Sequence, residues 1–225
     1  MGPDCQRHRR HPPITQTVEA ATAMSISAPA DKTDRAIRRI VTGHNAQGRS
    51  ILTEDRAAPS VHTNPKRVGY HLTQLWMTDG SPALVGNEPD PTSRPLTLEP
   101  PPGGTVVRIV EFGPEGDWLT RLDAEGTREA WGDLGKGNAS TNHSGTAKHP
   151  LMHRTQSVDY GLILEGEITL VLDEEEVILR TGDFLVERGT NHAWANRSGK
   201  PCKVLFVLVD GSFDPEIAKH FPPKN

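Results

Sequence analysis

Two histidines and a carboxylate in the C-terminal half of the chain are the residues best suited to chemistry. His153, Asp159 and His192 lie within residues 149–196, a stretch of short strand patterns separated by glycines. Residues two apart on a strand share a face, so strands rather than a helix would bring these side chains together. Imidazole and carboxylate groups suit Fe, Mn, Ni or Zn, and they also serve as general acids and bases. The stretch therefore predicts a polar site inside a small β-barrel, with or without a divalent metal ion.

A further histidine, His149, lies four residues before His153. If this segment is an extended strand, a rise of about 3.3 Å per residue separates the two by roughly 13 Å. One ion cannot bind both at that distance, so His153 is the better candidate. On a later strand, His192, Trp194 and Asn196 share a face and would point into the same site.

Short strand patterns follow one another along most of the chain. We predict strands near 38–44, 48–55, 71–78, 105–112, 149–156, 158–165, 167–173, 176–180, 183–188, 192–197 and 202–209. In the C-terminal half they recur at about 8–12-residue intervals, which is typical of an antiparallel sandwich or barrel. The sequence therefore predicts an all-β fold.

The segments between and beyond these strands have a different composition. Residues 1–35 lack periodicity and are rich in Pro, Ala, Thr and Arg, so we predict a disordered N-terminal extension. Residues 79–104 contain seven prolines and 113–148 are glycine-rich, and both are predicted to be irregular. Asp214 and Pro215 suit the N-cap and first position of a short C-terminal helix.

Composition and charge exclude several classes of protein. With 25 basic and 29 acidic residues, the net charge is −4, which gives no support to nucleic-acid binding. No apolar run approaches the roughly 20 residues that span a bilayer, so no membrane association is expected. The two cysteines, Cys5 and Cys202, do not form a disulfide framework, which favours a reducing, cytoplasmic location.

The region around the first histidine resembles the first motif of the cupin superfamily, Gly-x5-His-x-His-x3,4-Glu-x6-Gly. With Gly166 as the closing glycine, Asp159 takes the glutamate position. His153 then takes the place of the first histidine, and Thr155 that of the second. The chain therefore departs from the motif at one ligand position.

The second cupin motif, Gly-x5-Pro-x-Gly-x2-His-x3-Asn, is similar to a segment that begins at Gly182. Gly189, His192 and Asn196 take the later positions, the proline is missing, and the interval between the glycines is one residue shorter. The resemblance implies a double-stranded β-helix (jelly-roll) barrel over residues 36–225, with its motif core at 149–209.

The resemblance also implies a metal site, because most metal-binding cupins use three histidines and a glutamate. Here it leaves His153, Asp159 and His192, since threonine is a poor ligand for a divalent ion. These three could form a two-histidine, one-carboxylate site completed by water or substrate oxygen. Equally, they could form a metal-free pocket in which a histidine acts as acid or base and Asp159 orients it.

Function is constrained less closely than fold. We expect a small-molecule enzyme with catalytic residues His153, Asp159 and His192, and with a substrate pocket that includes Thr155, Trp194 and Asn196. Lyase or isomerase chemistry is favoured, because a depleted ligand set suits acid–base or Lewis-acid work better than oxygen activation. A non-haem Fe(II) oxygenase and a non-catalytic ligand-binding cupin remain as alternatives. The family further implies a homodimer paired through residues 38–78.

Overall fold

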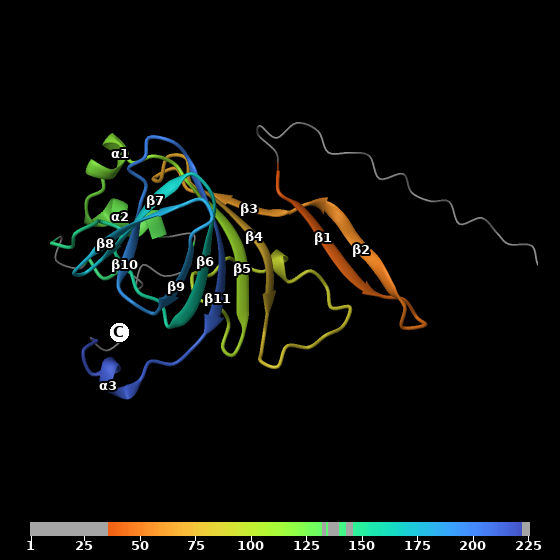
Figure 1. The fold of residues 1–225 in the computed structure, drawn as a ribbon. Coiled ribbons are helices and arrows are strands. Elements are labelled where there is room, and N and C mark those ends of the chain that lie inside the picture. Colours follow the sequence, from red (N-terminus) through yellow and green to blue (C-terminus); the bar gives the residue numbers. More distant parts are fainter. Residues whose placement is uncertain (1–35, 132–133, 135–139, 143–145, 222–225) are drawn as a thin grey trace, which may run out of the picture. The chain divides into compact units, whose positions relative to one another are not determined.

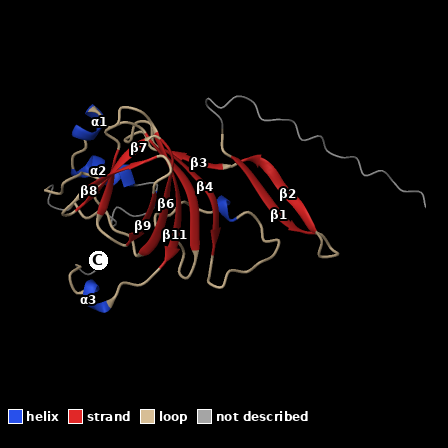
Figure 2. Ribbon diagram, in the orientation of Figure 1, coloured by secondary structure: helices blue, strands red, loops and turns tan. Residues whose placement is uncertain are grey.

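The computed structural model describes residues 36–131, 134, 140–142 and 146–221. The disordered extension predicted over residues 1–35 lies outside this part of the chain. Strands make up most of the regular structure, as Figures 1 and 2 show. The all-β prediction is therefore confirmed.

The described residues contain eleven strands, three α-helices and one turn of 3-10 helix. The strands are β1 (Arg38–His44), β2 (Ser50–Ala57), β3 (Ser60–Thr63), β4 (His71–Thr78), β5 (Thr105–Phe112), β6 (Ser157–Glu165), β7 (Glu167–Leu172), β8 (Glu176–Arg180), β9 (Phe184–Arg188), β10 (His192–Ala195) and β11 (Cys202–Asp210). The helices are η1 (Pro91–Ser93), α1 (Asp117–Thr120), α2 (Ala124–Trp131) and α3 (Pro215–Ala218). No helix in the described residues is long and apolar enough to cross a bilayer.

Two of the sheets share one hydrophobic core, and a third is a hairpin. The larger sheet has the order β3-β4-β5-β11-β6-β9, and the smaller has the order β10-β7-β8. All neighbouring strands in them pair antiparallel. Val110 of β5 and Ile168 of β7 belong to the same buried cluster, so the two sheets pack face to face.

Alternating side chains fix which side of each strand faces this core. In β5, every second residue is buried, and β11 shows the same alternation. Successive side chains of a strand point to opposite faces, so one row packs inward and the other turns outward. The site described below lies among the inward rows.

The structure differs from the sequence prediction at 149–156, where no strand forms. Pro150 has no N–H to donate, and the Met152 N–H instead donates to the His149 carbonyl at 3.2 Å, closing a turn. His153 alone takes part in pairing there, through isolated bridges. The extended spacing predicted between His149 and His153 is therefore wrong.

Smaller differences occur elsewhere. Strand β3 forms where no strand was predicted, and helices α1 and α2 form within residues 113–148, which were predicted to be irregular. In β4, the register shifts between Gln74 and Trp76, so Trp76 leaves the face on which Leu72 lies. At the C-terminal end the prediction is confirmed, because the Asp214 carboxylate accepts from the backbone N–H of Glu216 at the start of α3.

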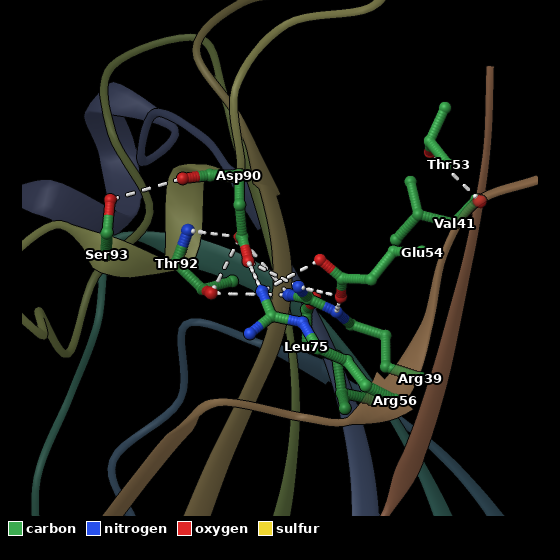
Figure 3. Close-up of polar contacts among 9 residues, drawn as sticks. All are labelled: Arg39, Val41, Thr53, Glu54, Arg56, Leu75, Asp90, Thr92 and Ser93. Carbon is green, nitrogen blue, oxygen red and sulfur yellow. Dashed lines mark hydrogen bonds and ion pairs between the residues drawn. The ribbon is translucent and has the colours of Figure 1, made fainter.

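A cluster of charged side chains attaches the β1-β2 hairpin to the rest of the domain (Figure 3). Arg39 of β1 is only 6% exposed and pairs with Glu54 of β2 and with Asp90, which precedes η1. It also donates to the carbonyl of Leu75 in β4 at 3.1 Å. Partial burial would raise the pKa of Asp90, but hydrogen bonds from Arg39 and Thr92 outweigh it and lower the pKa to about 2.

Replacement of Arg39 by methionine should therefore destabilise the domain, because it leaves the carboxylates of Glu54 and Asp90 with only the half-exposed Arg56 as a cationic partner. We expect a loss of about 1–2 kcal/mol, between the values for surface and buried pairs, measured by urea unfolding near neutral pH. The stabilisation from Asp90 is fully present above the ordinary carboxyl pKa of 3.8 and is lost as the pH falls through about 2.

Arg38 offers a matched control on the same strand. Its ion pair with Asp55 is exposed to solvent, so Arg38→Met should leave the unfolding midpoint close to that of the wild type. Equal losses in the two variants would contradict the attachment role of Arg39.

Candidate functional site

A short antiparallel bridge brings His153 and His192 together. The His153 N–H donates to the His192 carbonyl at 2.8 Å, and the His192 N–H donates to the His153 carbonyl at 2.9 Å. Residues that oppose each other in this way place their side chains on the same side of the pair. The two imidazole centroids are accordingly 4.2 Å apart, and both residues are buried.

Backbone carbonyls fix the tautomer of both rings. Nδ1 of His153 lies 3.1 Å from the Leu151 carbonyl, and Nδ1 of His192 lies 3.0 Å from the Thr190 carbonyl. A carbonyl only accepts, so each Nδ1 carries a proton, and in the neutral form of either ring the lone pair lies on Nε2. Burial first, and then the neighbouring His192, lower the pKa of His153 well below its usual value. His153 is therefore a neutral base or ligand near neutral pH.

A tight turn between β9 and β10 positions His192. The buried Glu187 carboxylate accepts from both the N–H and the hydroxyl of Thr190. Gly189 has φ +62°, and a Cβ there would come within 2.7 Å of the Phe213 ring and 3.0 Å of the Thr155 carbonyl. Both observations favour glycine at this position.

Asp159 enters the same region from β6. It lies directly opposite Glu187 of β9 and is 8% exposed. Burial, reinforced by the charge of Glu187, raises the pKa of Asp159 to about 7, against the opposing effects of Ser157 and Arg108. Its Oδ1 atom has no hydrogen-bond partner among the described residues. Asp159 can therefore exchange a proton near neutral pH.

These side chains line one cavity between the two sheets. The cavity holds about 490 Å³ of space free of atoms, part of it open to solvent. Its polar lining includes His153, His192 and Asp159, and Trp131 of α2 packs on His153 with centroids 4.6 Å apart. Its apolar lining includes Leu72, Val110, Phe112, Leu134, Phe206 and Leu208. The character of this lining suits the apolar body of a small molecule.

Comparison with known proteins identifies the family. Residues 141–208 match the family described as Cupin domain. The chain is 35% identical over 184 residues to "Phomopsin biosynthesis cluster protein C'" of Diaporthe leptostromiformis, covering 78% of this chain and 79% of that protein. The chain belongs to the cupin superfamily. Two further relatives are named cupin-domain-containing oxidoreductases. One is srdD of Neurospora crassa, which is 30% identical over 78% of this chain and 76% of its own. The other is fogC of Aspergillus ruber, which is 29% identical over 76% of this chain and 71% of its own.

The cupin site contains two good candidate metal ligands. Nε2 of His153 and of His192 has no hydrogen-bond partner within the described part of the chain, and the carbonyl bonds at Nδ1 are those that orient metal-bound histidines. Asp159 lines the cavity, but no three His, Cys, Asp or Glu side chains among the described residues lie close enough to share an ion. The histidine pair fits two positions of a divalent ion, and water or substrate atoms would fill the others.

Two of the three predicted pocket residues line the central cavity of this cupin. Thr155 accepts a hydrogen bond from the Ser157 hydroxyl at 2.9 Å, and Trp194 lies with its ring 5.7 Å from that of His192. Asn196 differs, because its amide N–H groups donate to the carbonyls of Phe112 and Lys200. Its side chain holds the turn after β10 and is not available for substrate.

His149 belongs to a neighbouring part of the cupin fold. Its Nδ1 accepts from the Leu151 N–H at 3.1 Å, so its Nε2 donates to Glu115 at 2.8 Å. Both nitrogen atoms are occupied, so His149 has no free lone pair for a metal ion.

The sequence reasoning missed two arginines that line the cavity, Arg67 and Arg108. For Arg108 a signal existed: it takes an inward position in the otherwise apolar row of β5, where a charge breaks the alternating pattern. Arg67 precedes β4 in a loop, where no periodicity marks its direction.

Proposed function

We propose that this cupin is a small-molecule enzyme of secondary metabolism whose cavity catalyses proton transfer of the lyase or isomerase type. The observation that carries the proposal is the buried pair His153 and His192, with free Nε2 lone pairs, in one cavity with Asp159. A relative named a phomopsin biosynthesis cluster protein supports the metabolic setting.

In this proposal the histidine pair supplies the base, and Asp159 supplies the acid. For a dehydration, an Nε2 lone pair takes a proton from a substrate carbon, and that C–H electron pair forms the new double bond. The hydroxyl group leaves with the proton of Asp159 as water. For an isomerisation, the proton taken by the base returns at a different carbon. The apolar walls exclude water from the reacting carbon.

The names of the relatives favour oxidoreductase chemistry as a second candidate. In that case His153 and His192 would hold a divalent ion such as Fe(II), which when bound supplies activation of oxygen or of the substrate. Asp159 would then hold or release a proton beside it. A cupin that binds a small ligand without turnover is the third alternative.

Deletion of the gene in its native organism tests these alternatives. We expect one metabolite to accumulate, and we expect the purified protein to convert it without oxygen. The masses should then be equal or differ by water or carbon dioxide, and an isomerisation in D₂O should place deuterium in the product. A requirement for oxygen would favour the oxidoreductase, and no conversion under any condition would favour the binding protein.

We also propose a homodimer in the cytoplasm, formed through the β1-β2 hairpin. In the described structure this hairpin is a separate two-stranded sheet, so each strand has one unpaired edge. Ile51 and Leu52 on it are 41% and 58% exposed. Light scattering on the full chain would measure the mass of the assembly.

A further inference from the structure

Two buried arginines in the cavity have no acidic partner. Arg67 is 7% exposed and Arg108 is 3% exposed, and both line the space that the histidine pair faces. Neither forms an ion pair with a carboxylate among the described residues, although ten other arginine and lysine side chains there do so. Burial of an unpaired cation is costly, so such groups call for a functional explanation.

Arg108 is held in place by the chain and still has donor capacity. One terminal nitrogen donates to the carbonyls of Thr97 and Leu98, at 3.0 and 3.3 Å. Its Nε atom is buried without any partner in the described structure. The guanidinium is therefore fixed at the wall of the cavity with an N–H group that a ligand can satisfy.

Arg67 is held by aromatic rings rather than by acids. Its guanidinium lies 3.9 Å from the centroid of Tyr70 and 5.5 Å from that of Trp131. Stacking of this kind occupies the face of the guanidinium, and its edge interacts with Tyr70 while keeping further N–H groups that can donate. The edge of Arg67 is thus available to an anion in the cavity.

We propose that the cavity recognises an organic acid, whose carboxylate binds to Arg67 and Arg108 and whose apolar body packs on Leu72, Val110, Phe206 and Leu208. This substrate class rests on the proposed function. A carboxylate accepts several N–H groups at once and is the natural partner of guanidinium groups. Two cations that face one cavity give its lining a net positive charge. A neutral substrate would leave these cations without a partner.

The placement of the two arginines also fits the proposed chemistry. Arg67 is close enough to His153 for its charge to act on that ring, and Arg108 acts similarly on Asp159. A carboxylate held here would bring the adjacent carbon atoms of the substrate toward both proton carriers. Arg67 and Arg108 are thus binding residues that also orient the substrate.

Calorimetric titration of the full chain with matched acids and amides tests the proposal. The probes are phenylacetate, cinnamate and octanoate, each compared with its neutral amide of the same shape. We expect at least one acid to bind about tenfold or more tightly than its amide, because only the acid pairs with the buried cations. Arg67→Met and Arg108→Met should each reduce this preference about tenfold.

Arg121→Met is the matched control, since that side chain is 77% exposed and should not affect binding. Arg108→Lys keeps the charge and should retain part of the preference, and thermal unfolding would confirm that every variant is folded. If no acid binds more tightly than its amide, or if the preference survives in both methionine variants, the proposal is wrong. Binding is measured without turnover, so an acid preference in a protein that converts no metabolite would refute the proposed enzyme and leave this inference intact.

Discussion

At about pH 8, replacement of Asp159 by asparagine should stabilise the protein. The pKa of this carboxyl is raised from 3.8 to about 7 in the folded state, chiefly by burial. The folded protein therefore keeps the proton up to about pH 7, whereas the unfolded chain loses it near pH 4. Stability contributed by the protonated group is fully present below pH 3.8 and is lost as the pH rises toward 7.

The expected difference follows from the size of this shift. A change of about three pKa units corresponds to roughly 4 kcal/mol in unfolding free energy, which we take as an upper figure. The Asp159→Asn variant lacks the ionisation, so its advantage should be largest above pH 7 and should shrink toward zero near pH 4. Urea unfolding at several pH values measures it directly.

Asp117→Asn is the matched control, because the Asp117 side chain is 91% exposed. That variant should follow the wild type at every pH. Equal stabilities of wild type and Asp159→Asn at pH 8 would show that folding does not raise the pKa of the Asp159 carboxyl. If the variant is more stable and also inactive, Asp159 is retained for function at a cost in stability.

The strands were predictable wherever side chains alternate. β4 and β5 begin and end at the predicted residues, and in β5 the alternating inward row is recognisable in the sequence, whereas in β4 a register shift between Gln74 and Trp76 interrupts it. The segment at 149–156 was wrongly predicted to be a strand, although its apolar residues Leu151 and Met152 are adjacent and do not alternate with polar ones. There, the missing N–H of Pro150 and the local turn at His149 prevent a strand from forming.

The residues of the site could be predicted from the sequence, but the distances between their side chains could not. The motif resemblance named His153, Asp159 and His192, and the structure places all three on one cavity. The contact between the histidine rings depends on a single isolated bridge, which no strand pattern in the sequence predicts. Arg108 could have been noticed as a charge in an apolar row, whereas Arg67 comes from a loop whose path depends on the tertiary fold.

Replacement of His192 by alanine should reduce turnover of the metabolite identified by gene deletion about 10²–10⁴-fold. This is the usual contribution of a positioned general base, and His192 is fixed by Thr190 for that role. Added imidazole should restore part of the activity by entering the space left by the ring. Steady-state assays with and without imidazole measure both effects.

The control is His71→Ala, since the His71 side chain is 50% exposed and is not part of the cavity lining, so turnover of this variant should be unchanged. His192→Gln is closer in volume to the wild type than His192→Ala, so it serves as a second variant in case His192→Ala fails to fold.

Treatment of the wild type with a chelator separates the two chemistries at the same site. If the enzyme catalyses proton transfer, the protein treated with chelator keeps its turnover, because the free Nε2 lone pairs act directly on the substrate. If turnover disappears on chelation and returns with added Fe(II), His153 and His192 act as metal ligands, and the oxidoreductase chemistry named for the relatives becomes the better explanation.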